Sequence, residues 1–113
     1  MRFSKSFTVK GKIERAFDLT EKYVQGMKFN IKNAVRPTLL VLERGSGLAA
    51  FTSTKIEDCK TTLTISLKQI NEEFSVLCDY DITVYGIATS SDKSTLESEV
   101  EKLKHFLVTG LTS

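Results

Sequence analysis

The stretch TLTISLKQINEEFSVLCDYDITVYG, from Thr62 to Gly86, decides the fold because it contains two alternating strands joined by a short turn. Apolar residues occupy every second position on both sides of Asn71-Glu72, a period that is typical of strands with one buried face. A turn centred on these two residues places apolar residues opposite apolar ones and polar residues opposite polar ones: Leu67–Val76, Ile65–Cys78, Leu63–Tyr80, Lys68–Ser75, Thr64–Asp79 and Thr62–Asp81. A slip of one residue would turn the apolar face to water, so this register is strongly specified.

Asp79 and Asp81 raise the question of whether this strand carries a catalytic carboxylate pair. Residues two apart in a strand lie on the same face, so both aspartates are expected on one face, while Cys78 and Tyr80 lie on the other. The aspartates and Tyr80 therefore do not converge, and two acids on a threonine-rich face are typical of a solvated surface. Acid–base chemistry is the alternative, and it would need a pocket that raises the pKa of one carboxyl group.

A strand and a helix precede the other strands. Residues 3–9 alternate apolar and polar side chains up to Gly11. From Lys12 the apolar period changes to that of a helix, which Gly26 ends. The apolar side of this helix consists of Ile13, Ala16, Phe17, Thr20, Val24 and Met27.

Several shorter strands lie between this helix and the hairpin. Residues 28–35 alternate, with Phe29, Ile31 and Val35 expected on one face, and Pro37 ends the strand because it cannot donate to a sheet. The predicted segments that follow are a short apolar strand at 38–43, a turn at 45–47, a weaker strand at 48–55 and a connecting loop at 56–60.

A second helix closes the chain. Ser94 and Glu97 have the spacing of a capping box at its start, and Gly110 is expected at its end. Its apolar stripe consists of Leu96, Val100, Leu103 and Leu107, with Phe106 beside it. The predicted fold is therefore α+β, a single domain over residues 1–113 with the order β-α-β(about five)-α, in which an antiparallel sheet packs against the C-terminal helix.

The composition is that of a globular protein: of 113 residues, 41% are hydrophobic and 27% are charged. No apolar run approaches the roughly 20 residues of a membrane span. The N-terminus alternates polar and apolar residues and does not resemble a signal peptide, so we expect a cytoplasmic protein. Residues 1–44 hold ten Lys/Arg against four Asp/Glu, whereas residues 45–113 hold six against ten. This asymmetry is typical of strands whose solvated faces differ in sign, with a nucleic-acid partner as the alternative.

Few residues are available for metal, cofactor or covalent chemistry. The two cysteines, Cys59 and Cys78, lack metal-ligand spacing, and the single histidine, His105, is expected on the exposed side of the last helix. We therefore predict no metal site, no cofactor and no catalytic residue. Cys78 is expected to point inward as a small core residue, with no histidine nearby to activate it. The basic strip at residues 28–36 carries no interleaved aromatic residues, which argues against nucleic-acid binding.

Three parts of the chain resemble the helix-grip superfamily, which includes START lipid-transfer domains, proteins of the birch-pollen-allergen type and polyketide cyclases. These parts are FTVKGKIERAFDLTEKY at 7–23, the hairpin at 62–86 and the closing amphipathic helix LESEVEKLKHFLV at 96–108. The resemblance implies that the C-terminal helix lies across a strongly curved antiparallel sheet, with a hydrophobic ligand between them. This chain would be a shortened form, because members of the superfamily are usually longer and contain more strands.

The same resemblance implies a ligand-binding pocket lined by the sheet and the last helix. Tyr80 would be the polar group inside it that orients a ligand oxygen. The predicted lining residues are Phe51, Leu63, Ile65, Cys78, Tyr80, Ile82, Leu103, Phe106 and Leu107. The alternative is that these residues form an ordinary, filled core.

The sequence thus favours a small module that binds a hydrophobic or amphipathic molecule without catalysis. The alternative is a protein-interaction or self-associating protein, such as a homodimer. Leu77 and Tyr85 are apolar residues on an otherwise polar face, and residues 39–42 are apolar on both faces of their strand. An enzyme stays open as a third class only because some helix-grip proteins are cyclases or hydrolases, and no constellation in the sequence would perform such a reaction.

Overall fold

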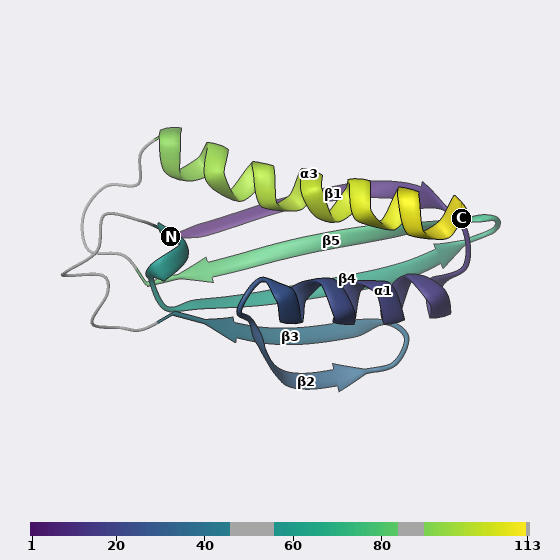
Figure 1. Ribbon diagram of the computed structural model, residues 1–113, viewed down its shortest axis with the longest axis horizontal. Coiled ribbons are helices and arrows are strands. Elements are labelled where there is room, and N and C mark those ends of the chain that lie inside the picture. Colours follow the sequence, from purple (N-terminus) through teal and green to yellow (C-terminus); the bar gives the residue numbers. More distant parts are fainter. Residues whose placement is uncertain (46–55, 84–89, 113) are drawn as a thin grey trace.

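The computed structural model of the protein describes residues 1–45, 56–83 and 90–112 (Figure 1). Its elements are, in chain order, β1 (Arg2–Lys10), α1 (Ile13–Gly26), β2 (Asn30–Val35), β3 (Leu39–Arg44), the 3-10 turn η1 (Ile56–Asp58), β4 (Thr61–Ile70), β5 (Glu73–Ile82) and α3 (Ser90–Thr112). The strand predicted at 48–55 lies outside the described residues, and the predicted loop at 56–60 contains η1. Neither helix in the described part of the chain combines the length and the apolar character that a membrane crossing needs.

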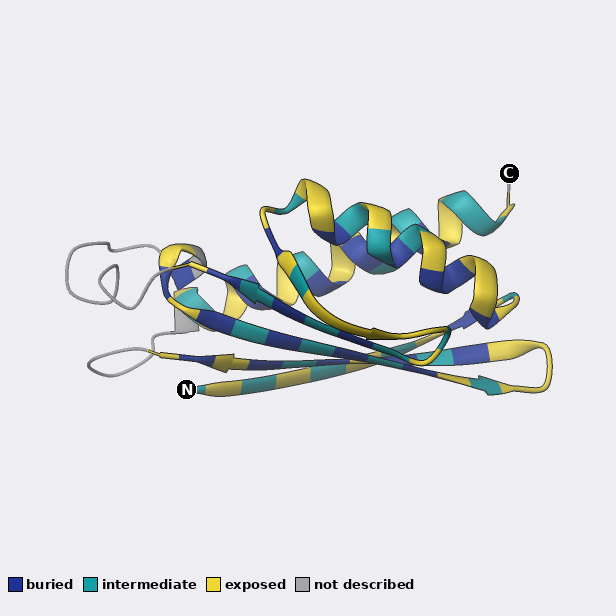
Figure 2. Cartoon of the chain, turned by 90° about the horizontal axis from the view of Figure 1, so that it is seen from below, coloured by how far each residue is buried: buried dark blue, intermediate teal, exposed yellow. Residues whose placement is uncertain are grey.

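The described strands form one five-stranded sheet in the order β1-β5-β4-β3-β2, and all neighbours are antiparallel. Both helices lie on the same side of this sheet (Figure 2). One face of the sheet is therefore covered, and the other faces solvent. This arrangement confirms the predicted α+β fold, in which an antiparallel sheet packs against the C-terminal helix.

The hairpin of β4 and β5 has the predicted register: Leu67 pairs with Val76, and Leu63 pairs with Tyr80. The turn lies at Asn71-Glu72, where Asn71 has a positive φ of 57°, a conformation that asparagine tolerates better than most residues. The inward side chains of β5 are at most 2% exposed: Phe74, Val76, Cys78, Tyr80 and Ile82. They form the centre of the core beneath the two helices.

Asp79 and Asp81 lie on the opposite, outer face of β5, as predicted. Asp81 is exposed, and Asp79 is half-buried next to β1. There Asp79 accepts hydrogen bonds from the Ser4 hydroxyl (2.9 Å) and from the Arg2 guanidinium (3.2 Å). The carboxylate pair therefore belongs to the solvated side of the sheet, away from both helices.

The prediction that Val35 shares a face with Phe29 and Ile31 is wrong. Ile31 pairs with Leu42 of β3, but the register shifts immediately afterwards, because Lys32 is an extra residue in β2. Such a bulge moves every later side chain to the other face of the strand. Val35 is consequently 50% exposed on the outer face of the sheet.

Helix α3 is longer than predicted at both ends. It begins at Ser90, four residues before the predicted cap at Ser94, and it continues through Gly110 to Thr112. A β-carbon on Gly110 would lie 2.9 Å from Cδ1 of Leu19. Gly110 therefore marks a close approach of α3 to α1 and not the end of the helix.

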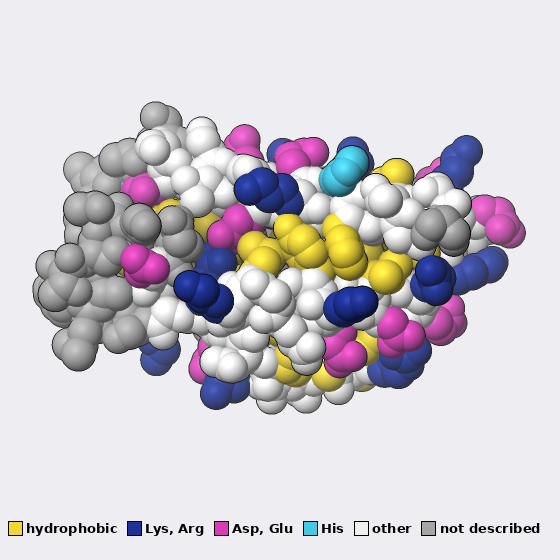
Figure 3. Space-filling view, in the orientation of Figure 1, with side chains coloured by type: hydrophobic (Ala, Val, Ile, Leu, Met, Phe, Trp, Pro, Cys, Tyr) yellow, Lys and Arg dark blue, Asp and Glu magenta, His cyan; other side chains and the backbone are white. Residues whose placement is uncertain are grey.

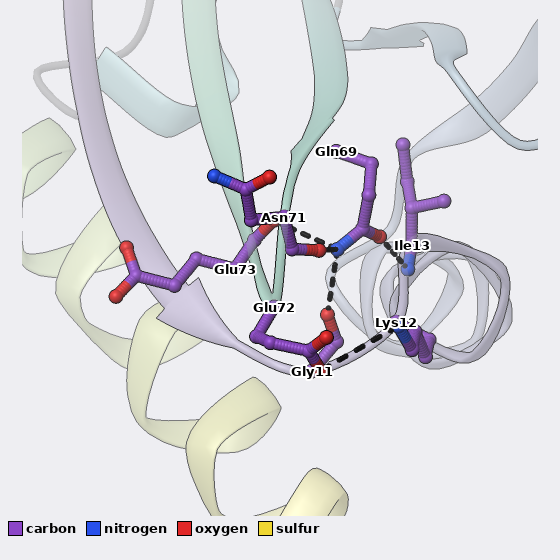
Figure 4. Close-up of polar contacts among 7 residues, drawn as sticks. All are labelled: Gly11, Lys12, Ile13, Gln69, Asn71, Glu72 and Glu73. Atoms are coloured by element: carbon purple, nitrogen blue, oxygen red, sulfur yellow. Dashed lines mark hydrogen bonds and ion pairs between the residues drawn. The ribbon is translucent and has the colours of Figure 1, made fainter.

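The side chain of Gln69 links the connection between β1 and α1 to the turn between β4 and β5 (Figure 4). Helix α1 has no side-chain cap at Lys12, and instead Oε1 of Gln69 accepts a hydrogen bond from the Ile13 amide at 2.8 Å. Its Nε2 atom lies 3.1 Å from the carbonyl of Gly11 and 2.8 Å from the carbonyls of Asn71 and Glu73. One amide group thus satisfies backbone groups of both connections.

Candidate functional site

Three polar side chains meet inside the apolar core: Arg44 of β3, Tyr80 of β5 and Glu99 of α3. Glu99 accepts hydrogen bonds from Nη1 of Arg44 at 3.0 Å and from Nη2 at 3.2 Å, which is the two-bonded geometry of a strong ion pair. The Tyr80 hydroxyl donates to Oε1 of Glu99 at 3.0 Å. The side chains of Arg44 and Glu99 are only 8% and 13% exposed. We call these three residues the polar cluster.

The local sequence explains why each residue of the polar cluster points inward. Arg44 follows Leu40 and Leu42 at the two-residue period of β3, and both leucines are fully buried. Glu99 lies three residues after Leu96 and four before Leu103, which places it on the apolar side of α3.

The sequence prediction included Tyr80 but missed its two partners. It placed the end of the strand at Glu43, one residue before the inward position of Arg44. For the inward side of the last helix it listed only apolar residues, and Glu99 was not among them. The periodicities alone would have found both charged residues, but not that they contact each other.

Burial and charge set the electrostatics of the polar cluster. Burial, together with the nearby Glu99 carboxylate, raises the pKa of Tyr80 far above its ordinary value, so its hydroxyl stays protonated. The Arg44 guanidinium stacks on the ring of Phe29 at 4.3 Å from the ring centre. Its Nε atom is buried and has no hydrogen-bond partner within the described ranges. A buried N–H group without a partner is stabilised when a hydrogen-bond acceptor lies beside it.

A cleft of about 440 Å³ lies next to the polar cluster. Its described lining comes from the end of α1, the end of β3, η1 and α3: Gly26, Met27, Lys28, Arg44, Gly45, Asp58 and Glu99. Two of these residues have a positive φ, Lys28 (68°) and Gly45 (83°). Two chain reversals therefore shape this side of the molecule, and Arg44 and Glu99 are the lining residues that also belong to the core.

Most of the predicted pocket-lining residues do come together. Leu63, Ile65, Cys78, Tyr80, Ile82, Leu103 and Leu107 are all buried in one cluster between the sheet and α3. Phe106 lies apart from them: it is half-buried, and its ring packs against that of Tyr23 at 5.0 Å. Phe51 lies outside the described residues. Burial in a common cluster is compatible with both a ligand pocket and a filled core.

Among the described residues, the remaining candidates for chemistry do not gather into a site. His105 is exposed on α3, as predicted. Burial raises the pKa of the Cys78 thiol to about 12, so the reactive thiolate is disfavoured. Within the described ranges, no three His, Cys, Asp or Glu side chains gather where they could hold a metal ion.

A shallow groove of about 470 Å³ runs between the outer sides of α1 and α3. Its lining consists of Tyr23, Ser98, Glu101, Lys102, His105, Phe106 and Thr109. Figure 3 shows a row of hydrophobic side chains between the two helices, flanked by charged ones. This groove is on the surface, whereas the polar cluster is on the inner side of α3.

Comparisons with known proteins bear on the fold. No protein-family profile and no curated protein sequence matches the chain. CalU16 from Micromonospora echinospora is 7% identical, with a TM-score of 0.64 over 94% of this chain and 71% of that one. Ara h 8.0201 is 8% identical, with a TM-score of 0.65 over 100% of this chain and 99% of that one. An uncharacterised protein from Bacillus thuringiensis is 10% identical, with a TM-score of 0.57 over the whole of both chains.

Identities this low are informative about backbone architecture and not about activity. The shared architecture agrees with the arrangement seen here, in which α3 lies against the inner face of the sheet. The protein has the helix-grip fold.

Proposed function

We propose that this protein binds a hydrophobic or amphipathic small molecule between the sheet and α3, without catalysing a reaction. The observation that carries this proposal is the polar cluster, an ion pair and a tyrosine hydroxyl surrounded by apolar side chains next to a cleft. Ligand pockets typically combine apolar walls with a few polar groups that set the ligand's orientation. A buried ion pair contributes little net stability compared with apolar residues of similar volume, which favours a role in binding.

In this proposal the walls are the buried residues of β4, β5 and α3, and the polar cluster is the orienting end. In this proposal the role of Tyr80 differs from the one that the resemblance implies. Its hydroxyl proton is directed at Glu99, so we propose that Tyr80 holds the carboxylate in place and does not donate to the ligand itself.

The test compares ligand binding by two variants of β4. One places a phenylalanine on the inner face of the strand, and the other places it on the outer face. Ile65 is fully buried on the inner face, and its neighbour Thr64 is on the outer face. Lipid extracts of the purified protein are analysed by mass spectrometry. Thermal unfolding is then measured in the presence of a series of amphipathic compounds, because a ligand stabilises the folded state that binds it. Ile65→Phe should abolish the ligand-dependent stabilisation, and Thr64→Phe should retain it. The proposal is wrong if no compound stabilises the wild type, or if both folded variants respond alike.

Self-association is the second candidate, and the outer face of the sheet supports it. Val35, Leu39 and Leu77 lie in one row across the strands, because Val35 pairs with Leu39, and Ser66 pairs with both Leu39 and Leu77. Val35 and Leu77 are 50% and 43% exposed. Sedimentation equilibrium at high concentration, compared between the wild type and Leu77→Ser, would reveal a dimer that depends on this row. A concentration-independent monomer would eliminate this candidate.

A further inference from the structure

Arg44 has one guanidinium nitrogen without an acceptor. Nη1 and Nη2 both bond to Glu99, whereas Nε is buried and has no partner in the described part of the chain. Burying a donor without an acceptor is unfavourable, so an acceptor atom placed at Nε would be favoured. Arg44 also lines the cleft, which brings a small molecule to this side chain, and a bound acceptor reaches the covered Nε atom after a local shift of the atoms over it.

The charge around Arg44 is already balanced. The described lining of the cleft contains two cationic residues, Arg44 and Lys28, and two anionic ones, Asp58 and Glu99. The positive charge of Arg44 is directly compensated by Glu99 at hydrogen-bonding distance. A ligand carboxylate at Nε would lose its hydration and lie close to the Glu99 carboxylate. An uncharged oxygen accepts the same hydrogen bond without that repulsion.

We infer that the polar end of the bound molecule is an uncharged hydrogen-bond acceptor, a carbonyl, ether or hydroxyl oxygen, which Arg44 receives through Nε while Glu99 excludes carboxylates. This inference rests on the proposed function, because it specifies the ligand of the same site. Arg44 is then the residue that contacts the ligand, and Glu99 is the residue that sets the selectivity.

The test compares probes that share a ten-carbon chain and differ only at the polar end: 2-decanone, 1-decanol and decanoate. Affinities are measured by calorimetry at neutral pH, where decanoate is ionised. The ketone and the alcohol should bind the wild type at least about tenfold more tightly than decanoate, because the like charges of the acid and Glu99 repel each other.

A charge change at Glu99 should reverse this order. Glu99→Gln keeps the shape of the side chain but leaves Arg44 with an uncompensated positive charge, so decanoate should become the preferred probe. Glu97→Gln is the matched control, since Glu97 is exposed on the same helix and the variant loses the same charge. It should keep the order of the wild type.

A spectroscopic readout follows Arg44 in the wild type. The sequence contains four arginines, so the Nε–H signals in nitrogen–proton NMR spectra are few, and Arg44→Lys identifies the one that belongs to Arg44. In the wild type, 2-decanone should shift this signal in the direction of a stronger hydrogen bond. Equal or tighter binding of decanoate, or an unmoved Arg44 signal in the presence of bound ketone, overturns the inference and leaves the proposed function standing. If none of the probes binds, both are overturned.

Discussion

Glu99 and Arg44 form a two-bonded ion pair that joins helix α3 to the end of strand β3, with both side chains largely buried. The pair is formed by residues that are 55 positions apart in the chain. It is therefore a contact of the tertiary structure, and it links the last helix to the sheet.

Removing one member of this pair should destabilise the protein strongly. Arg44→Met leaves the buried Glu99 carboxylate without its partner, and such a change costs about 3 kcal/mol or more. The double variant Arg44→Met/Glu99→Leu removes both charges and should recover most of the loss. Urea unfolding of the wild type, the two single variants and the double variant gives the coupling energy. Additive losses in the double variant would contradict a directly coupled pair.

Gln69 should be a structural residue whose amide cannot be replaced by a carboxylate. Gln69→Ala removes the acceptor for the Ile13 amide and the donor for three carbonyl groups, and we expect a loss of about 1–3 kcal/mol. Gln69→Glu should be more harmful at neutral pH, because its carboxylate would face these carbonyl oxygens.

The pH dependence of Gln69→Glu has a definite sign. Folding would raise the pKa of the new carboxyl group, so the deficit relative to the wild type should be smaller at about pH 4 than at about pH 7. Urea midpoints at the two pH values measure this difference. Gln25→Glu, at an exposed position of α1, is the control and should show little deficit at either pH. A pH-independent deficit at position 69 would show that the amide donor is unimportant.

Gly45 and Gly26 should respond in opposite ways to alanine. At Gly45, φ is +83° and a β-carbon would clash with the carbonyl oxygen of Cys59. Because the obstacle is backbone, Gly45→Ala should destabilise the protein by about 1–3 kcal/mol or more. At Gly26 nothing lies within 4 Å of the added carbon, and Gly26→Ala should be neutral or stabilising by up to about 1 kcal/mol. The thermal unfolding midpoints of the two variants measure this contrast. Equal changes in the two midpoints would contradict it.

Cys78 should be unreactive in the folded protein. Burial raises the pKa of its thiol to about 12, and its side chain is almost fully enclosed. In a Cys59→Ala background, Ellman's reagent at about pH 8 should therefore modify Cys78 only after urea is added. Rapid modification without urea would show that the Cys78 thiol is reactive in the folded protein.

The sequence by itself determined the elements that depend on local periodicity. The hairpin of β4 and β5 is the clearest case, because its two strands are adjacent in the chain and only one register keeps Leu63 opposite Tyr80 and both aspartates on the outer face. The placement of His105 on the exposed side of α3 follows from the same kind of reasoning. These features need no knowledge of distant contacts.

Only the tertiary structure decided the features that depend on distant partners. The bulge at Lys32 turns the side chains at the end of β2 to the other face of the sheet. The side-chain amide of Gln69 caps helix α1 at Ile13, 56 residues away in the sequence. The polar cluster belongs to this group as well: periodicity places Arg44 and Glu99 on inward faces, but only the packing of α3 on the sheet makes them partners. A buried charge is tolerated where its counter-charge lies within hydrogen-bonding distance, and that distance is a property of the assembled fold.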